Sequence, residues 1–359
     1  MRIYLYQCAT DQINTLAAKC LKPILLLLSL TYGLFVKIIL FGYKIKLLCV
    51  QALSKPVISV GNITWGGTGK TPLVICICEY LKEKGFKPAV LTRGYMVNKA
   101  HGLKKNESIS DEAVVLQETL NDVPVMVGAN RFQMALSALR QGPVDVFILD
   151  DGYQHWRLRR DLNIVAINAT KPFGNGYLIP RGILREPVSH LQRAQMFVIT
   201  KSDLGKDNVK DIKEKLLRIC PDSLIVEAQY QAGGLIDLKE KEFDKEVSFL
   251  KEKTVCSFCS IGDPESFART LVNCGAHLKM NFAFLDHHIY SKEDIEGIIH
   301  FCKQNKIDTL VTTEKDVVKI EPYLDQLIHA CDFLCLKIKI QITQGHNEFF
   351  NRISDLLHR

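Results

Sequence analysis

The stretch that decides the fold is Val57-Ile-Ser-Val-Gly-Asn-Ile-Thr-Trp-Gly-Gly-Thr-Gly-Lys-Thr-Pro72. A β-branched run leads into glycines and then into Gly69-Lys70-Thr71, after which a helical pattern begins. This context is typical of a P-loop, in which backbone N–H groups surround phosphates, Lys70 contacts the β- and γ-phosphates and Thr71 binds Mg²⁺. Thr64 stands where such a loop usually has its first glycine, and a glycine-rich structural turn is the alternative. The predicted phosphate-binding residues are Thr64, Trp65, Gly66, Gly67, Thr68, Gly69, Lys70 and Thr71.

Two carboxylates follow a second apolar run. Val144–Leu149 reads as a buried strand, and Asp150 and Asp151 come directly after it. In open α/β sheets, ligands bind at the carboxyl ends of the strands. Two adjacent unpaired carboxylates repel each other unless a cation lies between them. We therefore expect Asp150 or Asp151 to bind Mg²⁺ with Thr71, the alternative being a solvated turn.

Strand-like and helical patterns alternate along the body of the chain. The expected strands are 56–60, 88–92, 123–127, 144–149, 162–167, 196–200, 254–261, 281–285, 309–313 and 333–340, and the expected helices are 72–84, 112–121, 130–141, 264–274, 291–304 and 322–330. Such alternation favours an α/β fold with a mostly parallel sheet. We expect a nucleotide-binding α/β domain at 51–230, a charged linker or hairpin at 231–253 and a smaller α/β domain at 254–359.

The N-terminal segment, residues 1–50, has a different character. Residues 24–43 read ILLLLSLTYGLFVKIILFGY, nearly long enough to cross a hydrocarbon core. Lys22, Lys37, Lys44 and Lys46 flank or interrupt this run. Basic residues at both ends favour a helix that lies in the membrane interface, with the body on the cytoplasmic side. A buried helix of the folded body is the alternative.

Charge and cysteine content exclude other classes. The formal net charge of +7 resides mainly in residues 1–60, which carry seven basic groups and one acidic group. The nearly neutral body lacks the basic surplus of a nucleic-acid-binding domain. The twelve cysteines are scattered in a long chain, which indicates buried thiols in a reducing cytosol. The one CxxC, Cys256-Ser-Phe-Cys259, has no second CxxC at finger spacing and is interpreted as core.

Six motifs together are more specific than any one of them. They are the segments 61–72, 92–95 (TRGY), 150–155 (DDGYQH), 173–180 (FGNGYLIP) with 184–187 (LREP), 286–288 (DHH) and 312–317 (TTEKDV). Their order and spacing resemble the tetraacyldisaccharide 4′-kinase family, which acts in lipid A biosynthesis. The resemblance covers nearly the whole chain. Tyr153 and Arg181 stand where this family often has Phe or Leu and Ala, respectively.

The resemblance implies a lipid kinase. It implies transfer of a phosphoryl group from ATP, with Mg²⁺, to the 4′-hydroxyl of an acylated glucosamine disaccharide 1-phosphate. The expected location is the cytoplasmic face of the bacterial inner membrane, with peripheral or monotopic attachment and no required oligomer. Gln154 and Glu186 match residues of the family's metal and nucleotide surroundings, and Lys70 is grouped with the catalytic residues.

The resemblance also implies a pair of residues for the acceptor hydroxyl. Asp111 matches the family's acidic residue proposed as base, and His287 matches its histidine partner. From the residues alone, Asp111 before a helix reads as an N-cap. Cationic or polar side chains suited to the anionic groups of ATP and of the 1-phosphate are Arg93, Arg131, His155, Asn175 and Arg185.

Two other functions stay open at this stage. Thr200-Lys-Ser-Asp203 resembles the guanine-reading signal of GTPases, and residues 312–316 weakly repeat it. With the P-loop, this permits a regulatory GTPase or metallochaperone-type NTPase. A non-catalytic membrane scaffold with a decayed P-loop is disfavoured because Lys70 and the two aspartates are intact.

Overall fold

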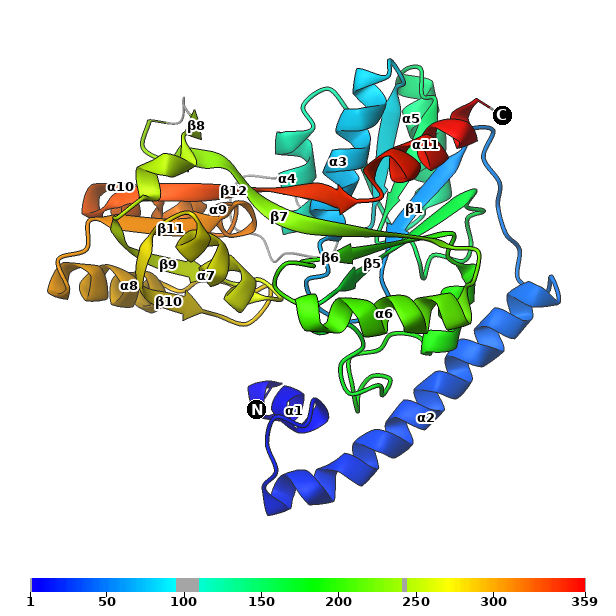
Figure 1. The fold of residues 1–359 in the computed structure, drawn as a ribbon, viewed down its shortest axis with the longest axis horizontal. Coiled ribbons are helices and arrows are strands. Elements are labelled where there is room, and N and C mark those ends of the chain that lie inside the picture. The colour runs from blue at the N-terminus through cyan, green and yellow to red at the C-terminus, as the bar shows by residue number, and fades with distance from the viewer. Residues whose placement is uncertain (1, 95–109, 241–243, 359) are drawn as a thin grey trace. The chain divides into compact units, whose positions relative to one another are not determined.

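The computed structural model describes residues 2–94, 110–240 and 244–358 (Figure 1). The chain forms two compact units, each described here by itself. Unit 1 contains Met1–Arg93, Leu120–Gln229 and Ile342–Arg359, and unit 2 contains Gly94–Thr119 and Tyr230–Gln341. The strand β7 (Leu224–Asp237) and the strand β12 (Asp332–Gln344) each begin in one unit and end in the other.

Unit 1 is built on a parallel sheet in the order β7-β6-β5-β1-β4-β2-β3. Besides β7, its strands are β1 (Val57–Gly61), β2 (Pro88–Thr92), β3 (Val125–Val127), β4 (Val146–Asp150), β5 (Leu162–Asn168) and β6 (Met196–Thr200). Its helices after the N-terminal segment are α3 (Lys70–Glu83), α5 (Arg131–Gln141), α6 (Lys206–Ile219), α11 (His346–Leu357) and the 3₁₀ turn η1 (Val188–Arg193). The strands β1, β2, β4, β5 and β6 are buried along their whole length, which fits a sheet covered on both faces.

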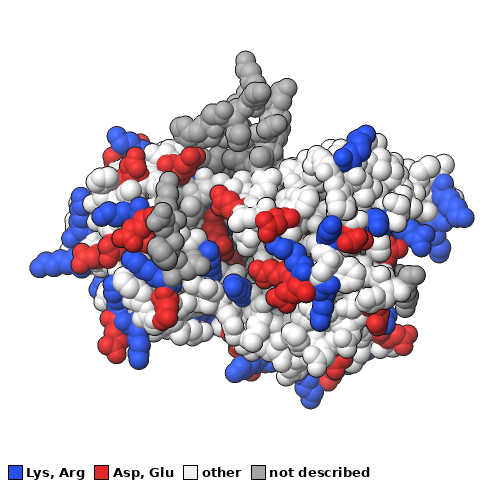
Figure 2. Space-filling view, turned by 90° about the horizontal axis from the view of Figure 1, so that it is seen from above, with Lys and Arg blue, Asp and Glu red and all other residues white. Residues whose placement is uncertain are grey.

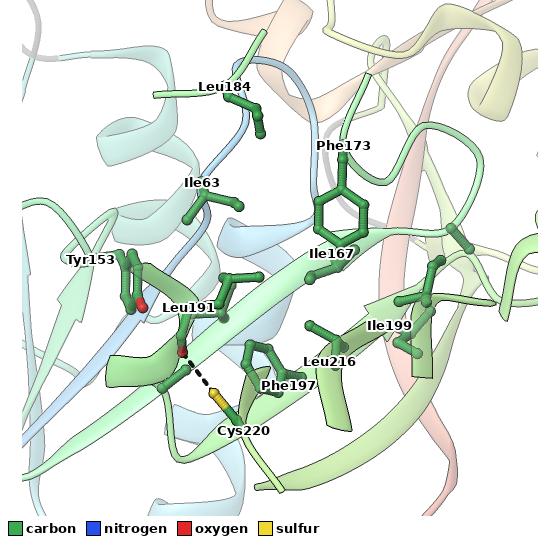
Figure 3. Packing of buried hydrophobic residues seen from close by; sticks show 14 residues of the cluster. Ile63, Tyr153, Ile167, Phe173, Leu184, Leu191, Phe197, Ile199, Leu216 and Cys220 are labelled. Carbon is green, nitrogen blue, oxygen red and sulfur yellow. Dashed lines mark hydrogen bonds between the residues drawn. The ribbon is translucent and has the colours of Figure 1, made fainter. Parts of the chain in front are cut away.

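One hydrophobic cluster of unit 1 extends from the sheet to the segments that follow β1 and β4 (Figure 3). It joins Ile63 after β1, Tyr153 after β4 and Leu184 to Phe197 on β6. The thiol of Cys220 donates to the carbonyl of Leu191 at 3.2 Å. Tyr153 is 1% exposed, so the aromatic ring at this position belongs to the core.

The N-terminal segment forms α1 (Arg2–Ala9) and the 29-residue α2 (Leu16–Lys44). Small residues of α2 face the rest of unit 1: the hydroxyl of Ser29 donates to the carbonyl of Leu178 at 2.5 Å, and a Cβ at Gly33 would come within 2.7 Å of Leu178 Cδ1. The opposite side of α2 exposes large apolar side chains, namely Ile24, Leu27, Leu28, Leu30, Leu34, Phe35, Ile38, Ile39 and Phe41. Leu25 and Val36 of α2 are also buried, but most of its large apolar side chains are exposed, so α2 differs from a buried core helix.

By length and composition alone, α2 could cross a membrane, with a mean hydropathy of 2.4 and 22% of its apolar window buried. Elsewhere the surface carries both signs of charge: on the face drawn in Figure 2, basic and acidic side chains are interspersed. The helix α2 differs from that face because most of its large side chains are apolar and exposed.

Unit 2 contains four neighbouring parallel strands in the order β10-β9-β11-β12, with β7 beyond β12. The further strands are β9 (Thr254–Cys259), β10 (His277–Ala283), β11 (Thr309–Thr313) and β8 (Asp244–Lys245), which pairs with β7 in the antiparallel sense. The helices are α4 (Asp111–Thr119), α7 (Pro264–Asn273), α8 (Lys292–Gln304), α9 (Glu314–Val317) and α10 (Leu324–Ala330), with the 3₁₀ turns η2 (Val247–Leu250) and η3 (Glu321–Tyr323). Cys256 and Cys259 are buried free thiols on β9, and all twelve cysteines, which lie in the described part of the chain, are free.

The chain passes between the units more often than the expected boundaries allow. The stretch expected as a linker or hairpin, 231–253, begins inside β7, which continues to Asp237 and pairs with β8 in the antiparallel sense. Gly233-Gly234 reads as a break, yet a Cβ at Gly233 would lie 2.8 Å from Lys339 Cγ, so glycine permits a close approach. The helix α4 belongs to unit 2, and α11 returns to unit 1, where Tyr80 stacks on Phe350 at 4.2 Å.

Candidate active site

The P-loop follows β1 and ends at the N-terminus of α3. Gly69 is the N-cap, with φ of 81°, a left-handed conformation that glycine adopts without strain. Lys70 begins the helix and Thr71 is 7% exposed. Backbone N–H groups at such a helix start, together with the helix dipole, favour bound phosphate. Trp65 is 66% exposed, so within the predicted loop it lies on the surface rather than in the core.

Carbonyl oxygens of the P-loop accept hydrogen bonds from neighbouring side chains. Asn62, which is fully buried, donates from Nδ2 to the carbonyl of Thr64 at 2.8 Å and to the hydroxyl of Thr68 at 2.9 Å. The hydroxyl of Thr200 donates to the carbonyl of Thr68 at 3.0 Å, and Lys201 Nζ lies 3.5 Å from the carbonyl of Gly67. Since carbonyls are engaged by the protein, the loop is organised before any ligand binds.

These contacts reassign the segment that resembled a guanine-reading signal. Thr200 and Lys201 follow β6 and support the P-loop through its carbonyl oxygens. Asn62 and these two residues were not among the expected site residues. A sequence signal existed for each, because Asn62 lies inside the P-loop motif and Thr200-Lys201 follows a buried strand at the same sheet edge.

The two aspartates at the end of β4 have different surroundings. The strand β4 pairs with β1, and Asp150 lies opposite Val60, which brings both strand ends to one edge. Asp150 is 3% exposed and accepts a hydrogen bond from the hydroxyl of Thr92 at 3.2 Å. Asp151, with φ of 47°, accepts from Arg185 Nη1 at 2.8 Å, and Lys70 Nζ is 3.7 Å from its Oδ1.

The charges around Asp151 determine its ionisation. Burial acts to raise the pKa of Asp151, but Lys70, Arg185 and Arg131 together hold it well below its usual range. The repulsion between neighbouring carboxylates, which suggested a metal from the sequence, is therefore relieved here by cationic side chains. In turn, the Asp151 carboxylate attracts the Lys70 ammonium group and keeps it at the P-loop, where phosphate would bind.

Gln154 and Glu186, both expected near a metal, already have protein partners. Gln154 Nε2 donates to the carbonyl of Asn62 at 2.8 Å. Glu186 is fully buried, and its Oε2 accepts from Arg193 at 2.6 Å and lies 3.0 Å from His190 Nδ1. A buried carboxylate that is paired with a cationic side chain has its charge compensated by the protein itself. Among the residues that the structure describes, no group of three His, Cys, Asp or Glu side chains could hold a metal ion.

Several arginine side chains lie near His155. Burial lowers the pKa of His155 to about 4, and the charges of Arg131, Arg160, Arg157 and Arg93 act in the same direction. Arg131 begins α5 and is 4% exposed, whereas Arg93 is exposed after β2. A neutral imidazole among arginines is suited to an anionic group. The motif residue Tyr95 lies outside the described residues.

Asn175 lies apart from this group, against the N-terminal segment. Its Nδ2 donates to the carbonyl of Ala9 at 2.8 Å and to Asp11 Oδ2 at 2.9 Å. Arg181 forms a two-pronged pair with Asp11 at 2.9 and 3.0 Å. The hydrogen bond from Arg181 holds the pKa of Asp11 well below its usual range, although burial opposes it. Asn175 and Arg181 thus fasten the link between α1 and α2.

Unit 2 brings Asp111 and His287 together. Ser110 supplies the helix cap, because its hydroxyl accepts from the N–H of Ala113 at 3.2 Å. Asp111 is therefore the first residue of α4 and not its N-cap. Its Oδ2 lies 3.1 Å from His287 Nδ1 and 3.3 Å from Lys319 Nζ. The pair that the resemblance implied is in contact here, with Lys319 as an added member.

The segment after β11 supplies the cations beside α4. Lys315 Nζ donates to Glu112 Oε1 at 2.7 Å, and Lys319 is 9% exposed beside Asp111. Burial opposes ionisation of Asp111, but the hydrogen bond with His287 and the charges of Lys319 and Lys315 hold its pKa well below its usual range. Neither lysine was expected as a site residue. For Lys315 the sequence signal was the motif at 312–317, which only tertiary contacts connect to this helix, whereas Lys319 lies two residues beyond the motif.

Comparisons with known proteins agree on one family. Residues 21–358 match the family described as Tetraacyldisaccharide-1-P 4'-kinase. The chain is similar to the tetraacyldisaccharide 4'-kinase of Halothermothrix orenii, with 35% identity over 90% of both chains. It is also similar to the probable mitochondrial tetraacyldisaccharide 4'-kinase of Arabidopsis thaliana, with 33% identity over 90% of this chain and 87% of that one. The solved structure of LpxK from Aquifex aeolicus in complex with ATP superposes with a TM-score of 0.70 at 27% identity, covering 94% of this chain and 99% of that chain.

Proposed function

We propose that this protein, which belongs to the tetraacyldisaccharide-1-P 4′-kinase family, transfers a phosphoryl group from ATP to the 4′-hydroxyl of an acylated glucosamine disaccharide 1-phosphate. The observation that carries the proposal is the P-loop at the end of β1, with Lys70 held 3.7 Å from Asp151. Phosphoryl transfer requires chiefly positioning and charge neutralisation. A regulatory GTPase is not favoured, because the segment at 200–203 supports the P-loop and the family consists of kinases.

The P-loop fits the triphosphate of ATP. Its carbonyls are bound by Asn62, Thr200 and Lys201, while its N–H groups lie at the start of α3. The solved relative holds ATP. Lys70 would neutralise phosphate charge, and Thr64 to Thr71 would surround the phosphates.

Mg²⁺ is proposed at Thr71 and Asp150. Mg²⁺ keeps several waters and takes one or two carboxylates together with substrate phosphates, so a dedicated protein cage is not required. Thr71 is the second residue of α3, which follows β1, and Asp150 ends β4, which pairs with β1. Bound there, the ion would neutralise phosphate charge. Gln154 and Glu186 are proposed to shape this surrounding through Asn62 and η1 rather than to ligate the ion.

The acceptor's 1-phosphate is proposed to meet the arginines around His155. Arg131, Arg93 and His155 lie in one cationic region of unit 1, and planar guanidinium groups bind phosphate in two-pronged fashion. Arg185 is assigned instead to hold Asp151, and Asn175 to hold the N-terminal segment.

The acylated substrate requires access to a membrane. We assign this to α2, whose exposed side carries large apolar residues while Lys37 and Lys44 supply positive charge. An apolar face with flanking basic residues favours an interfacial helix and attraction to anionic headgroups. Because ATP is the donor, the proposed location is the cytoplasmic face of the bacterial inner membrane.

The test is transfer of labelled γ-phosphate from ATP to a tetraacylated glucosamine disaccharide 1-phosphate in detergent micelles, with GTP and no-acceptor controls. Acceptor-dependent transfer from ATP is the expected result. Hydrolysis without transfer, or a preference for GTP, would contradict the proposal. The double substitution Lys70→Ala with Asp151→Asn supplies an inactive reference with the same α2.

A further inference from the structure

The segment 178–185 precedes η1 and pairs with the first residues of the P-loop, inside unit 1. An antiparallel bridge joins Thr64 to Leu184. Across this bridge, the N–H of Trp65 and the N–H of Arg185 each donate to a carbonyl at 2.7 Å. The start of the P-loop therefore takes its position from this segment.

The buried face of α2 contacts the same segment. The hydroxyl of Ser29, which is 3% exposed, donates to the Leu178 carbonyl at 2.5 Å and accepts from the N–H of Arg181 at 3.0 Å. Three residues further along α2, the hydroxyl of Tyr32 donates to the Arg185 carbonyl at 2.8 Å. Residues three apart share a helix face, so both hydroxyls belong to the face of α2 that packs on unit 1.

Hydrogen bonds inside the segment connect the residues that α2 contacts to those that the P-loop contacts. The N–H of Ile179 donates to the Leu184 carbonyl at 2.9 Å. The N–H of Gly182 donates to the Leu178 carbonyl at 2.9 Å. Glycine permits this turn to be tight, because a Cβ at Gly182 would overlap the carbonyl of Tyr177. The segment is thus a compact turn whose two ends are bonded to each other.

Arg185 connects this turn to the charged groups of the nucleotide site. Its Nη1 donates to Asp151 Oδ1 at 2.8 Å and to Asn62 Oδ1 at 3.1 Å. Asp151 in turn lies 3.7 Å from Lys70 Nζ. The N–H of Arg185 is bound in the pairing with the P-loop, and its carbonyl is bound by Tyr32. Because both backbone groups are held, the guanidinium group reaches Asp151 from a fixed position.

We propose that Tyr32 is a positioning residue for Arg185, and that packing of α2 against segment 178–185 favours the conformation of the P-loop that binds ATP. The inference rests on the proposed function in taking ATP as the nucleotide. The exposed apolar face of α2 is assigned to the membrane, and its buried face supports the nucleotide site through Ser29 and Tyr32. One helix therefore serves both membrane contact and ATP affinity.

The coupling acts in both directions. If α2 packed on the segment gives tighter ATP binding than α2 released from it, ATP must favour the packed state by the same factor. Burial raises the pKa of Tyr32, so its hydroxyl keeps its proton and donates at neutral pH. The substitution Tyr32→Phe keeps the ring and removes the donor to the Arg185 carbonyl. One hydrogen bond of this kind corresponds to about a fivefold change in an equilibrium constant.

The first test is the affinity of the full chain for ATP, measured by calorimetric titration in detergent micelles, with folding checked by thermal melting. We expect Tyr32→Phe to weaken ATP binding about fivefold, and Ser29→Ala to weaken it as well. The matched control is Thr31→Val, which removes a hydrogen bond of 2.8 Å to the Leu28 carbonyl on the exposed side of α2 and should leave the affinity unchanged. In an Arg185→Gln background, Tyr32→Phe should change the affinity much less, because a positioning residue acts through its partner.

The second test is the reactivity of an introduced thiol toward a maleimide, followed at that residue by mass spectrometry. Val36 is 5% exposed on the buried face of α2, whereas Leu34 is 59% exposed on the outer face. In Val36→Cys, saturating ATP should slow the labelling by up to about fivefold, since ATP favours the packed helix. In the control Leu34→Cys, the labelling rate should be the same with and without ATP.

Three outcomes would overturn the inference. One is a Tyr32→Phe protein that binds ATP as tightly as the wild type. Another is an equal loss from Tyr32→Phe in the wild-type and the Arg185→Gln backgrounds, which would show that Tyr32 does not act through Arg185. The third is labelling of Val36→Cys that ATP does not slow. Neither test uses the lipid acceptor, so a chain that binds ATP and transfers no phosphate would refute the proposed function alone.

Discussion

The substitution Asn62→Ala tests whether the buried side chain of Asn62 orders the P-loop. Asn62 is fully buried and makes three hydrogen bonds. Nδ2 donates to the Thr64 carbonyl at 2.8 Å and to the Thr68 hydroxyl at 2.9 Å, and Oδ1 accepts from Arg185 at 3.1 Å. Alanine removes all three and leaves a buried carbonyl of the loop without this partner.

The size of the effect follows from those bonds. Two neutral hydrogen bonds at about 1 kcal/mol each and one charged bond at about 2 kcal/mol give a loss of about 4 kcal/mol. For a unit of this size, each kcal/mol lowers the melting temperature by about 2–4 °C, so we expect a fall of about 10 °C. The loop must then be ordered on binding, and a cost of about 1.4 kcal/mol weakens ATP affinity about tenfold.

Thermal melting and calorimetric titration with ATP measure the two effects. The matched control is Asn305→Ala, which removes one exposed hydrogen bond of 2.9 Å to the Phe301 carbonyl. Exposed changes of this kind stay within about 0.5 kcal/mol. If Asn62→Ala melts within about 2 °C of the wild type, a shift of about 1 kcal/mol or less, and binds ATP as tightly, the P-loop does not depend on this asparagine.

Three further predictions concern the site, the N-terminal helix and pH. Lys70→Ala should abolish transfer with little change in melting temperature, and a near wild-type rate would remove Lys70 from the site. Gly33→Leu should release α2 from Leu178 and expose the segment before β1 to limited proteolysis, because a Cβ at Gly33 already comes within 2.7 Å, whereas Gly297→Leu on α8 has open space and should not. The lowered pKa of Asp111 means that its stabilising contribution is present above its unfolded value of about 4 and is lost as pH falls below that. The raised pKa of His287 means that its contribution is present below about 6.5 and is lost as pH rises through the raised value. Melting temperatures of Asp111→Asn should therefore fall less at acid pH than those of the wild type, because Asp11 and Asp151 still contribute to that fall, and an unchanged profile would contradict the pairing.

Local patterns predicted the nucleotide half of the site. The run 57–72 predicted a strand, a loop and a helix, and the structure has β1, the loop and α3 there. The parallel α/β sheet was confirmed, with β1 beside β4. These features depend on hydrophobic runs and glycines that are contiguous in the chain, so the sequence carries them directly.

Side-chain partners across long separations were not predictable in this way. Asn175 was expected to contact an anionic group of a ligand. Its side chain instead donates hydrogen bonds to the Ala9 carbonyl and to Asp11, some 165 residues earlier. Lys319 gave no signal of its own, because its partner Asp111 belongs to a helix about 200 residues before it. Such pairs form where the fold brings distant parts of the chain together, which no local pattern records.

The sequence by itself determined the P-loop, the strand that ends in Asp150 and Asp151, and an apolar helix near the N-terminus, since each is a local pattern of residue types. Only the tertiary structure decided that Lys70 and Arg185 neutralise Asp151, that Ser110 caps α4 in place of Asp111, and that His287 is the exposed member of its pair. The physical reason is that ionisation and accessibility depend on which charges and which surfaces the fold brings together, and these come from distant parts of the chain.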